Sequence, residues 1–248
     1  MRPFFSLIIP TFNEANNDLY LQNLQEHGKS SHVEIIIVDA GSTDQTHSIS
    51  EAQCTHFITE KNSTRGHRLN IGSELARGDW IVWVHPRTRI KKECLDELTA
   101  LDSKKYAWGA WTHSFDKLDE LLRWTSWYSN HIRGDRRSIF YLDHCLFIHQ
   151  ELYQKFSKPL FVDVAIFEDT LVSIKLREQQ KAFRLKTKTM TSSIRFQKNG
   201  FFKQALLNFK AKVQFHLKFS HELINKDYEK NLSLNGLSSA AKETRIKL

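Results

Sequence analysis

Two adjacent acidic residues, Glu168 and Asp169, open the segment FEDTLVSIKLR, whose pattern predicts a helix over about 169–179. A carboxylate works as a general base when it lies within hydrogen-bond reach of a hydroxyl and when burial or a neighbouring negative charge raises its pKa. Two acids in the first turn of a helix also complement the positive end of the helix dipole. The pair therefore predicts either a catalytic base or a helix-terminal charge pair, and spacing alone leaves both open.

Arg87 belongs to a second polar cluster, HPRTR, which directly follows the apolar run Trp80 to Val84. Such a run is typical of a buried strand, so the cluster would lie at a strand end. A guanidinium carries a fixed positive charge and offers no lone pair. It cannot bind a metal ion, but it can hold a phosphate through paired hydrogen bonds. The cluster therefore predicts electrostatic chemistry carried by Arg87, with Arg89 as a second candidate.

Alternating strands and helices must position these groups. FSLIIP and VEIIIVD are short β-branched runs, as in strands covered on both faces, and each precedes a polar turn and a helix-compatible segment, the first capped by Asn13. This order predicts an α/β fold with a mostly parallel sheet flanked by helices. We expect strands near 5–10, 33–39, 80–84, 106–115, 141–148 and 183–186, and helices near 14–26, 44–52, 65–76, 91–101, 118–128, 150–156 and 169–179.

The carboxyl ends of parallel strands are where ligands of an open α/β sheet bind, so polar residues there are candidates for a binding site. They are Pro10, Thr11, Asn13 and Glu14 after the first strand, Asp39 after the second, and His85 after the strand at 80–84. The alternative for Asp39 is that it only shapes a turn. The chain lacks GxGxxG after its first strand and lacks GxxxxGK[ST], which argues against a dinucleotide dehydrogenase and a P-loop NTPase.

The composition excludes several other classes of protein. With 248 residues and 40% hydrophobic content, the chain can build the core of a large α/β domain. Its three cysteines are far apart and form no CxxC, which argues against a zinc site and a disulfide framework and predicts a reducing, cytoplasmic location. No run approaches the ~18 to 20 apolar residues of a membrane span, and the first apolar stretch is too short for a signal peptide.

The last third of the chain is strongly basic. Residues 175–248 hold 17 Lys+Arg against 5 Asp+Glu, whereas residues 1–174 hold 19 against 23. We therefore expect a catalytic domain over 1–198 and a basic helical extension with a tail over 199–248. An apolar stripe runs along this extension at helical spacing: Phe202, Ala205, Leu206, Phe209, Val213 and Leu217. The stripe either lies on an anionic membrane or packs on the catalytic domain, and nucleic acid is disfavoured because no RNA or DNA motif is present.

Four segments in order resemble the motifs of family 2 glycosyltransferases with the GT-A fold: SLIIPTFNEANN, EIIIVDAGSTDQT, RGHRLNIGSELARGDWIVWVHPRT and FEDTLVSIKLR. They are most similar to a small bacterial branch associated with arsenosugar biosynthesis, and the likeness extends over about 6–217. The resemblance implies an inverting transfer of a sugar from a nucleotide donor, with uridine preferred, to a hydroxyl acceptor. That acceptor is soluble or lipid-linked. Given the basic tail, it can lie at the inner face of a membrane. It also implies a base at Asp169, with Glu168 as its neighbour.

The resemblance further assigns the remaining positions of the site. Residues 10–14 and Asp39 would hold the base and ribose of the donor, and Arg65 and Asn70 match polar positions that line its site. Asp143 and His144 match an Asp-Gln pair that faces the acceptor, although His144 departs from that pattern.

The metal motif of the family is missing at Arg87. The branch has His-Ala-Asp-Thr where this chain has His-Pro-Arg-Thr, and the Asp would bridge Mg²⁺ or Mn²⁺ to the diphosphate. The cofactor is thus left open, because the family implies a divalent ion and the absent Asp argues against it. Either Arg87 replaces the metal as a clamp on the diphosphate, or the protein is a non-catalytic relative that serves as a binding partner. A third, less favoured alternative is that His85 still holds a metal together with Asp143 or Asp169.

Overall fold

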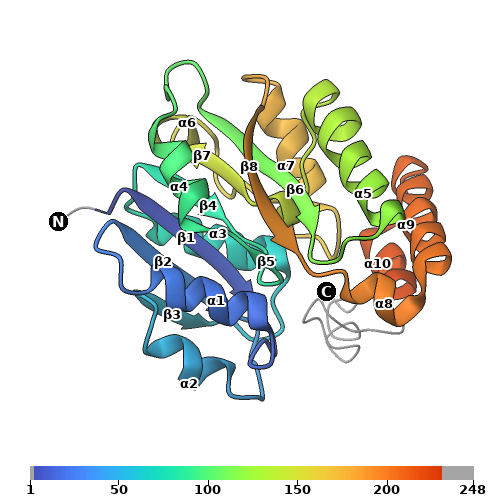
Figure 1. Ribbon diagram of the computed structural model, residues 1–248, viewed down its shortest axis with the longest axis horizontal. Coiled ribbons are helices and arrows are strands. Elements are labelled where there is room, and N and C mark those ends of the chain that lie inside the picture. The colour runs from blue at the N-terminus through green and yellow to red at the C-terminus, as the bar shows by residue number, and fades with distance from the viewer. Residues whose placement is uncertain (1–2, 231–248) are drawn as a thin grey trace, which may run out of the picture.

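The computed structural model describes residues 3–230, which form one eight-stranded sheet covered by helices on both faces (Figure 1). The strand order is β3-β2-β1-β4-β7-β6-β8-β5. Residues 231–248, the end of the expected basic extension, lie outside the described residues.

The sheet is parallel in its first half and mixed in its second. Strands β1 (Phe5–Thr11), β2 (Val33–Asp39), β3 (His56–Thr59) and β4 (Trp80–Trp83) are parallel. Strand β7 (Leu146–His149) lies antiparallel between β4 and β6 (Trp108–Phe115). Strand β8 (Phe183–Thr191) is parallel to β6 and antiparallel to the two-residue β5 (Thr88–Arg89). The carboxyl ends of β1, β2 and β4 therefore meet at one edge, as the strand pattern predicts.

The helices follow the predicted order, with differences at their ends. They are α1 (Asp18–His27), α2 (Thr46–Glu51), α3 (Arg65–Leu75), α4 (Lys92–Thr99), α5 (Glu120–Trp127), α6 (Gln150–Tyr153), α7 (Glu168–Arg177), α8 (Ile194–Asn199), α9 (Phe201–His216) and α10 (His221–Glu229). A π-helix continues α5 over Tyr128–Arg136, and a 3₁₀-helix spans Leu142–His144. The expectation that Asn13 caps α1 is wrong: Asn17 is the cap, and its side chain accepts from the Tyr20 backbone N–H.

The core lies on both faces of the sheet, because successive strand residues point to opposite sides. On β1, Leu7 and Ile9 belong to one buried cluster and Ile8 to the other. Helix α3 packs against β1 at Gly72, where an added Cβ would lie 2.4 Å from a methyl carbon of Ile8. This close approach fixes α3, and hence Arg65 at its first residue, against the sheet.

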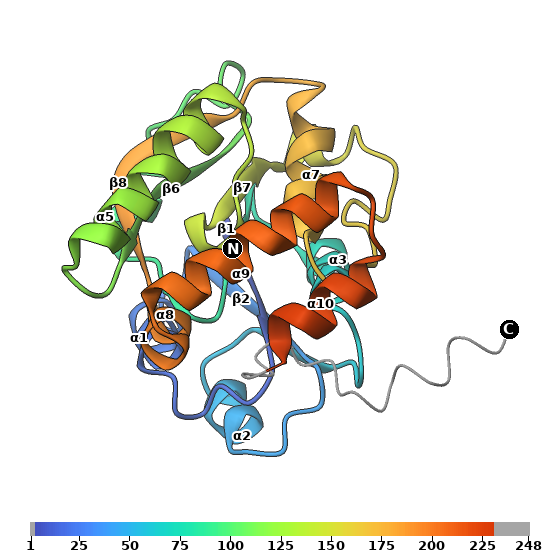
Figure 2. The ribbon, with the colours of Figure 1, turned by 90° about the vertical axis from the view of Figure 1, so that its right-hand side faces the viewer.

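The C-terminal helices α8, α9 and α10 lie on the same side of the molecule as α5, the side that faces the viewer in Figure 2. The apolar stripe of α9 points away from the protein: Phe202, Leu206 and Phe209 are 81%, 67% and 65% exposed. The buried residues of α9 are Gln204 and Ala211. The stripe is therefore not the surface that packs on the catalytic domain. None of the helices within 3–230 is long and apolar enough to cross a membrane.

Candidate active site

The acidic pair predicted from the sequence forms the first turn of α7. Phe167, directly before it, has a left-handed backbone with φ of 68°, which turns the chain into the helix. Both carboxylates are buried, and Oδ2 of Asp169 accepts a hydrogen bond from the Leu142 backbone N–H at 3.1 Å. Burial and the adjacent charge of Glu168 raise the pKa of Asp169 to about 6. Asp169 therefore has the burial and the pKa that a general base working near neutral pH requires.

Arg65 contacts this acidic pair from the start of α3. The Thr64 hydroxyl caps the helix by accepting from the His67 backbone N–H at 3.1 Å. The Arg65 guanidinium forms a close ion pair with Glu168 and lies 3.8 Å from Oδ2 of Asp169. Its positive charge opposes the rise in the Asp169 pKa, but burial outweighs it. Arg65 is thus paired with two buried carboxylates rather than extended into solvent from the first turn of α3.

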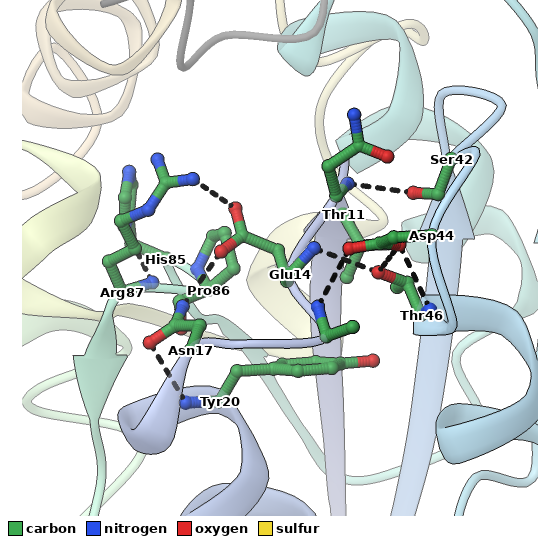
Figure 3. A network of polar contacts seen from close by, with 12 residues as sticks. Thr11, Glu14, Asn17, Tyr20, Ser42, Asp44, Thr46, His85, Pro86 and Arg87 are labelled. Atoms are coloured by element: carbon green, nitrogen blue, oxygen red, sulfur yellow. Dashed lines mark hydrogen bonds and ion pairs between the residues drawn. The ribbon is translucent and has the colours of Figure 1, made fainter.

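Arg87 is held by Glu14, which the close view in Figure 3 shows between Arg87 and the turn after β2. Nη2 of Arg87 lies 2.8 Å from Oε1 of Glu14, whose residue is 2% exposed. The Asn17 amide donates both to Oε2 of Glu14 at 2.8 Å and to the Pro86 carbonyl at 3.0 Å. Burial raises the pKa of Glu14 to about 7 against the opposing charge of Arg87. The second predicted cluster and the end of β1 therefore form one network.

His85 contacts this network through the backbone of Arg87. Its Nδ1 accepts from the Arg87 backbone N–H at 3.0 Å. Burial and the nearby charges of Arg65 and Arg87 hold the pKa of His85 well below its ordinary value. The imidazole is therefore neutral near pH 7 and carries its proton on Nε2.

Asp39 shapes the turn after β2, which is the alternative that its position left open. One carboxylate oxygen accepts from the Gly41 and Ser42 backbone N–H groups at 2.8 and 2.6 Å. The other accepts from the hydroxyls of Ser42 and Thr11 at 2.5 and 2.9 Å. A carboxylate can accept about four hydrogen bonds, so these four donors use all the acceptor positions of Asp39 in this conformation. A ribose hydroxyl would have to replace one of them.

Three other residues predicted to bind the donor, Pro10, Asn13 and Asn70, are held by contacts with other parts of the chain. Pro10 is buried within β1 opposite Val38, and Asn13 is exposed with φ of 53°. Asn70 on α3 exchanges two hydrogen bonds with the backbone of Phe161, at 2.8 and 2.9 Å. The Asn70 amide therefore ties α3 to the loop before α7.

A cavity of about 240 Å³ brings Asp169, Arg65, His85 and Arg87 together. Its walls also include residues from elements that do not follow the parallel strands of the first half of the sheet. Among the lining residues are His113 on β6, Arg133 on the π-helix, Asp143, Arg195 on α8, Lys212 on α9 and Tyr228 on α10. The sequence signal for Lys212 was its position off the apolar stripe; nothing in the sequence identified His113, Arg133 or Arg195. The described part of the C-terminal extension thus contributes to the site directly.

Asp143 lines the cavity, whereas His144 does not. Oδ2 of Asp143 lies 3.7 Å from Nε2 of His113. Burial would raise the pKa of Asp143, but the two neighbouring imidazoles and the Arg133 guanidinium lower it to about 2. Burial also lowers the pKa of both imidazoles, so Arg133 is the permanent positive charge of this group.

The expectation that His144 faces the acceptor is not met. It is fully buried beside the cavity, where its ring nitrogens contact the Ser129 hydroxyl at 2.6 Å and the Trp111 carbonyl at 3.1 Å.

A divalent ion does not fit the residues present after β4. Arg87 stands at the position of the expected carboxylate, and its guanidinium already pairs with Glu14. Among residues 3–230, no three His, Cys, Asp or Glu side chains are grouped so that they could hold a metal ion. Guanidinium groups line the cavity there instead, those of Arg65, Arg87 and Arg195. Arg68 adds a further positive charge at this edge, where it donates to the Thr11 carbonyl at 2.6 Å.

Comparisons with known proteins agree with this architecture. Residues 6–157 match the model of the family described as Glycosyl transferase family 2. No curated protein matches the chain. The structure of S. aureus TarS 1-349 in complex with UDP-GlcNAc has a TM-score of 0.61 at 17% identity, over 100% of this chain and 76% of that one. This chain spans 43% of a longer TarS chain.

Two further structures have the same fold. The mannosyltransferase PcManGT from Pyrobaculum calidifontis, in complex with GDP-Man and Mn²⁺, has a TM-score of 0.59 at 16% identity, over 97% of this chain and 74% of that one. Glucosyl-3-phosphoglycerate synthase from Mycobacterium tuberculosis has a TM-score of 0.55 at 14% identity, over 75% of this chain and 70% of that one. Because the family model covers more than half of the chain and the sheet and helices have the GT-A fold of these structures, the chain belongs to glycosyl transferase family 2.

Proposed function

We propose that the protein is an inverting glycosyltransferase in which Asp169 is the general base. The observation that carries this proposal is the meeting of Asp169, whose pKa is about 6, with Arg65 and Arg87 in one cavity. Asp169 takes the proton of the acceptor hydroxyl while its oxygen attacks the anomeric carbon of the donor sugar. The bond from that carbon to the diphosphate breaks, and its electron pair leaves with the nucleotide. Glu168 keeps the pKa of Asp169 raised.

The donor in this proposal is a nucleotide sugar, with a UDP-linked hexose preferred. It would lie beyond the carboxyl ends of β1 and β2, along Thr11, Asn13 and Asp39, with its diphosphate toward His85 and Arg87. The structures with the same fold support a nucleotide-sugar donor, because they contain UDP-GlcNAc and GDP-Man. The motif likeness to the arsenosugar-biosynthesis branch and a cytoplasmic location belong to the same proposal.

Arg87 takes the place of the metal in this scheme. Its charge, with that of Arg65, stabilises the negative charge that develops on the diphosphate as it leaves. The ion pair with Glu14 orients the guanidinium before a ligand arrives, so less rotamer freedom is lost on binding. A non-catalytic relative remains the alternative, and its support is the same replacement of Asp by Arg87.

Calorimetric titration of UDP and GDP into the protein, first with EDTA and then with Mn²⁺, tests this proposal. We expect UDP to bind in EDTA and Mn²⁺ not to improve the affinity, because Arg87 supplies the charge. Binding that appears only with Mn²⁺ would contradict the role of Arg87. No binding of either nucleotide in either buffer would favour the non-catalytic relative.

The outward apolar face of α9 favours a second role, attachment to an anionic membrane surface. Trp124 and Trp127, which belong to α5, are also exposed, at 61% and 50%. Helix α5 lies on the same side of the molecule as α9 (Figure 2). Exposed aromatic residues and exposed lysines such as Lys218, just after α9, are typical of helices that lie in the headgroup region of a bilayer. We propose that the protein contacts the membrane through this face, and vesicle flotation tests it.

A further inference from the structure

The five Arg and Lys side chains that line the cavity fall into two groups. Arg65, Arg87 and Arg195 each pair with a carboxylate: Glu168, Glu14 and Glu229 respectively. Arg133 and Lys212 form no ion pair with any carboxylate in the described part of the chain. Both side chains are partly buried, and one ionised carboxylate in the same cavity, that of Asp143, acts on both. One carboxylate balances one of the two positive charges, so the pair retains a charge that can bind a further anion.

Arg133 is held in place by neutral partners. Its guanidinium carbon lies 3.3 Å from the centre of the Tyr141 ring, and Nη2 contacts the Ser129 hydroxyl and Nε2 of His144, the latter at 3.2 Å. Its Nε is buried without a hydrogen-bond partner. The guanidinium is therefore fixed in orientation while retaining an unused donor and its full charge.

Lys212 approaches the same part of the cavity from α9. Its ammonium lies 5.7 Å from the centre of the Tyr128 ring. Burial and the repulsion of Arg133 lower its pKa to about 8, against the attraction of the Asp143 carboxylate. Two cations that repel each other across a cavity are stabilised further by an added anion between them.

The unpaired cations both act on Asp143, the residue that the motif likeness assigns to the acceptor. Tyr141, on which Arg133 stacks, is the residue before Leu142, whose backbone N–H bonds to Asp169. The paired cations Arg65 and Arg87 lie toward the strand ends where the donor is proposed. His113, 3% exposed and also lining the cavity, has an Nε2 without a hydrogen-bond partner. A second ligand group thus meets the positive charges of Arg133 and Lys212 on this side, whereas Nε2 of His113 faces the Asp143 carboxylate at 3.7 Å.

We propose that the acceptor carries a phosphate group, which binds between Arg133 and Lys212 while the acceptor hydroxyl reaches Asp169. This inference rests on the proposed function, because it identifies the acceptor of the same reaction. A phosphate monoester carries about −1.5 to −2 charges at pH 7 and three acceptor oxygens, enough to engage a guanidinium and an ammonium at once. The phosphate belongs either to a soluble molecule or to a lipid headgroup, and the two sources share this chemistry.

Binding of a phosphate probe, measured without any turnover, tests the site. The probes are glycerol 1-phosphate, glycerol as the uncharged control, and vesicles that contain phosphatidic acid. The variants are Lys212→Gln, Lys212→Arg and Lys203→Gln; Lys203 is a matched control, because it is an exposed lysine on the same helix. UDP is titrated into each variant in parallel, which reports on the donor site independently.

We expect the wild type to bind glycerol 1-phosphate but not glycerol, Lys212→Gln to bind it at least about tenfold more weakly, and Lys212→Arg and Lys203→Gln to retain it. UDP affinity should be the same in all variants. Binding only to phosphatidic acid vesicles, lost in Lys212→Gln and kept in Lys203→Gln, would support the inference with a lipid as the source.

Several results would overturn the inference. One is that Lys212→Gln binds the phosphate probe as tightly as the wild type, or that only Lys203→Gln loses probe binding. Another is that Lys212→Gln loses UDP affinity as much as it loses probe affinity. The last is that a protein that binds UDP binds neither phosphate probe. The protein could also bind the phosphate probe through Lys212 but bind no nucleotide. That result would support the phosphate site and contradict the proposed nucleotide-sugar donor.

Discussion

Nη2 of Arg87 lies 2.8 Å from Oε1 of Glu14, so the first residue after β1 that carries a negative charge holds the arginine that replaces the expected metal ligand. The two side chains come from loops that follow neighbouring parallel strands. Asn17 connects the same loops by bonding to Glu14 and to the Pro86 carbonyl. Arg87, at the position where the motif likeness predicts an Asp, therefore has a buried acidic partner.

Removing the Arg87 guanidinium tests whether it does the work of a metal. We expect Arg87→Ala to lower the rate of sugar transfer by about 10²- to 10³-fold, the effect of losing one strong electrostatic contact to the transition state. Arg89→Ala is the control, because Arg89 pairs with Glu26 and does not line the cavity. The measurement is the initial rate in EDTA, with thermal unfolding to confirm that both variants fold. Unchanged turnover of Arg87→Ala would reject the clamp.

Glu14 gives the protein a pH dependence of stability whose sign is fixed by its raised pKa. The carboxyl has an ordinary value of 4.5 and a folded value of about 7, so the folded state binds more protons between these limits. The contribution of Glu14 to the free energy of unfolding is therefore complete below about pH 4.5, and it is lost as the pH rises through 7. A shift of this size corresponds to ~3 kcal/mol at most.

Denaturant titrations of Glu14→Gln and the wild type between pH 4.5 and 8 measure this contribution. We expect the free energy of unfolding of the wild type to fall relative to the variant as the pH rises, because the glutamine cannot ionise. A constant difference between the two proteins across this range would show that Glu14 does not titrate in the folded state as its burial requires.

The strands of the first half of the sheet could be predicted from sequence, because each is a short apolar run with a polar turn behind it. The strand expected at 80–84 is β4 over Trp80–Trp83, and the helix expected at 65–76 is α3 over Arg65–Leu75. The strand expected from 141 starts only at Leu146, after the 3₁₀-helix whose first backbone N–H bonds to Asp169. That contact joins residues 27 apart in sequence, which local patterning cannot show.

The candidate site was predictable where its residues stand at the ends of expected elements. Asp169, Arg65 and Arg87 do meet in the cavity: the first two begin expected helices, and Arg87 follows an expected strand. Arg133 and Lys212 come from a π-helix and from the C-terminal extension, so their convergence depends on how α9 packs. The sequence also could not show whether the apolar face of α9 is buried or exposed, because the helical spacing of apolar residues is the same in both cases.

Replacing the base should separate chemistry from donor binding. Asp169→Asn cannot accept a proton, so we expect the transfer rate to fall by about 10²- to 10⁴-fold while UDP affinity stays unchanged. In the wild type the rate should rise with pH through about 6, because the carboxyl must be ionised to act as a base. Glu178→Gln, at the exposed far end of α7, is the control. A variant that keeps both the rate and this pH profile would assign the base elsewhere.

The outward face of α9 predicts attachment to anionic vesicles that depends on its aromatic residues. Phe202 and Phe209 are 81% and 65% exposed, and each would contribute roughly 1.5–3 kcal/mol if its ring were fully buried in the bilayer. We therefore expect the double variant Phe202→Ser and Phe209→Ser to lose flotation with anionic vesicles by more than about tenfold, without loss of stability, because both side chains are exposed. Val162→Ser, at an exposed apolar residue in the loop before α7, should float like the wild type. Flotation that is equal in the double variant would mean that the apolar face of α9 does not contact the membrane, and flotation unchanged by salt would remove the contribution of the lysines beside it.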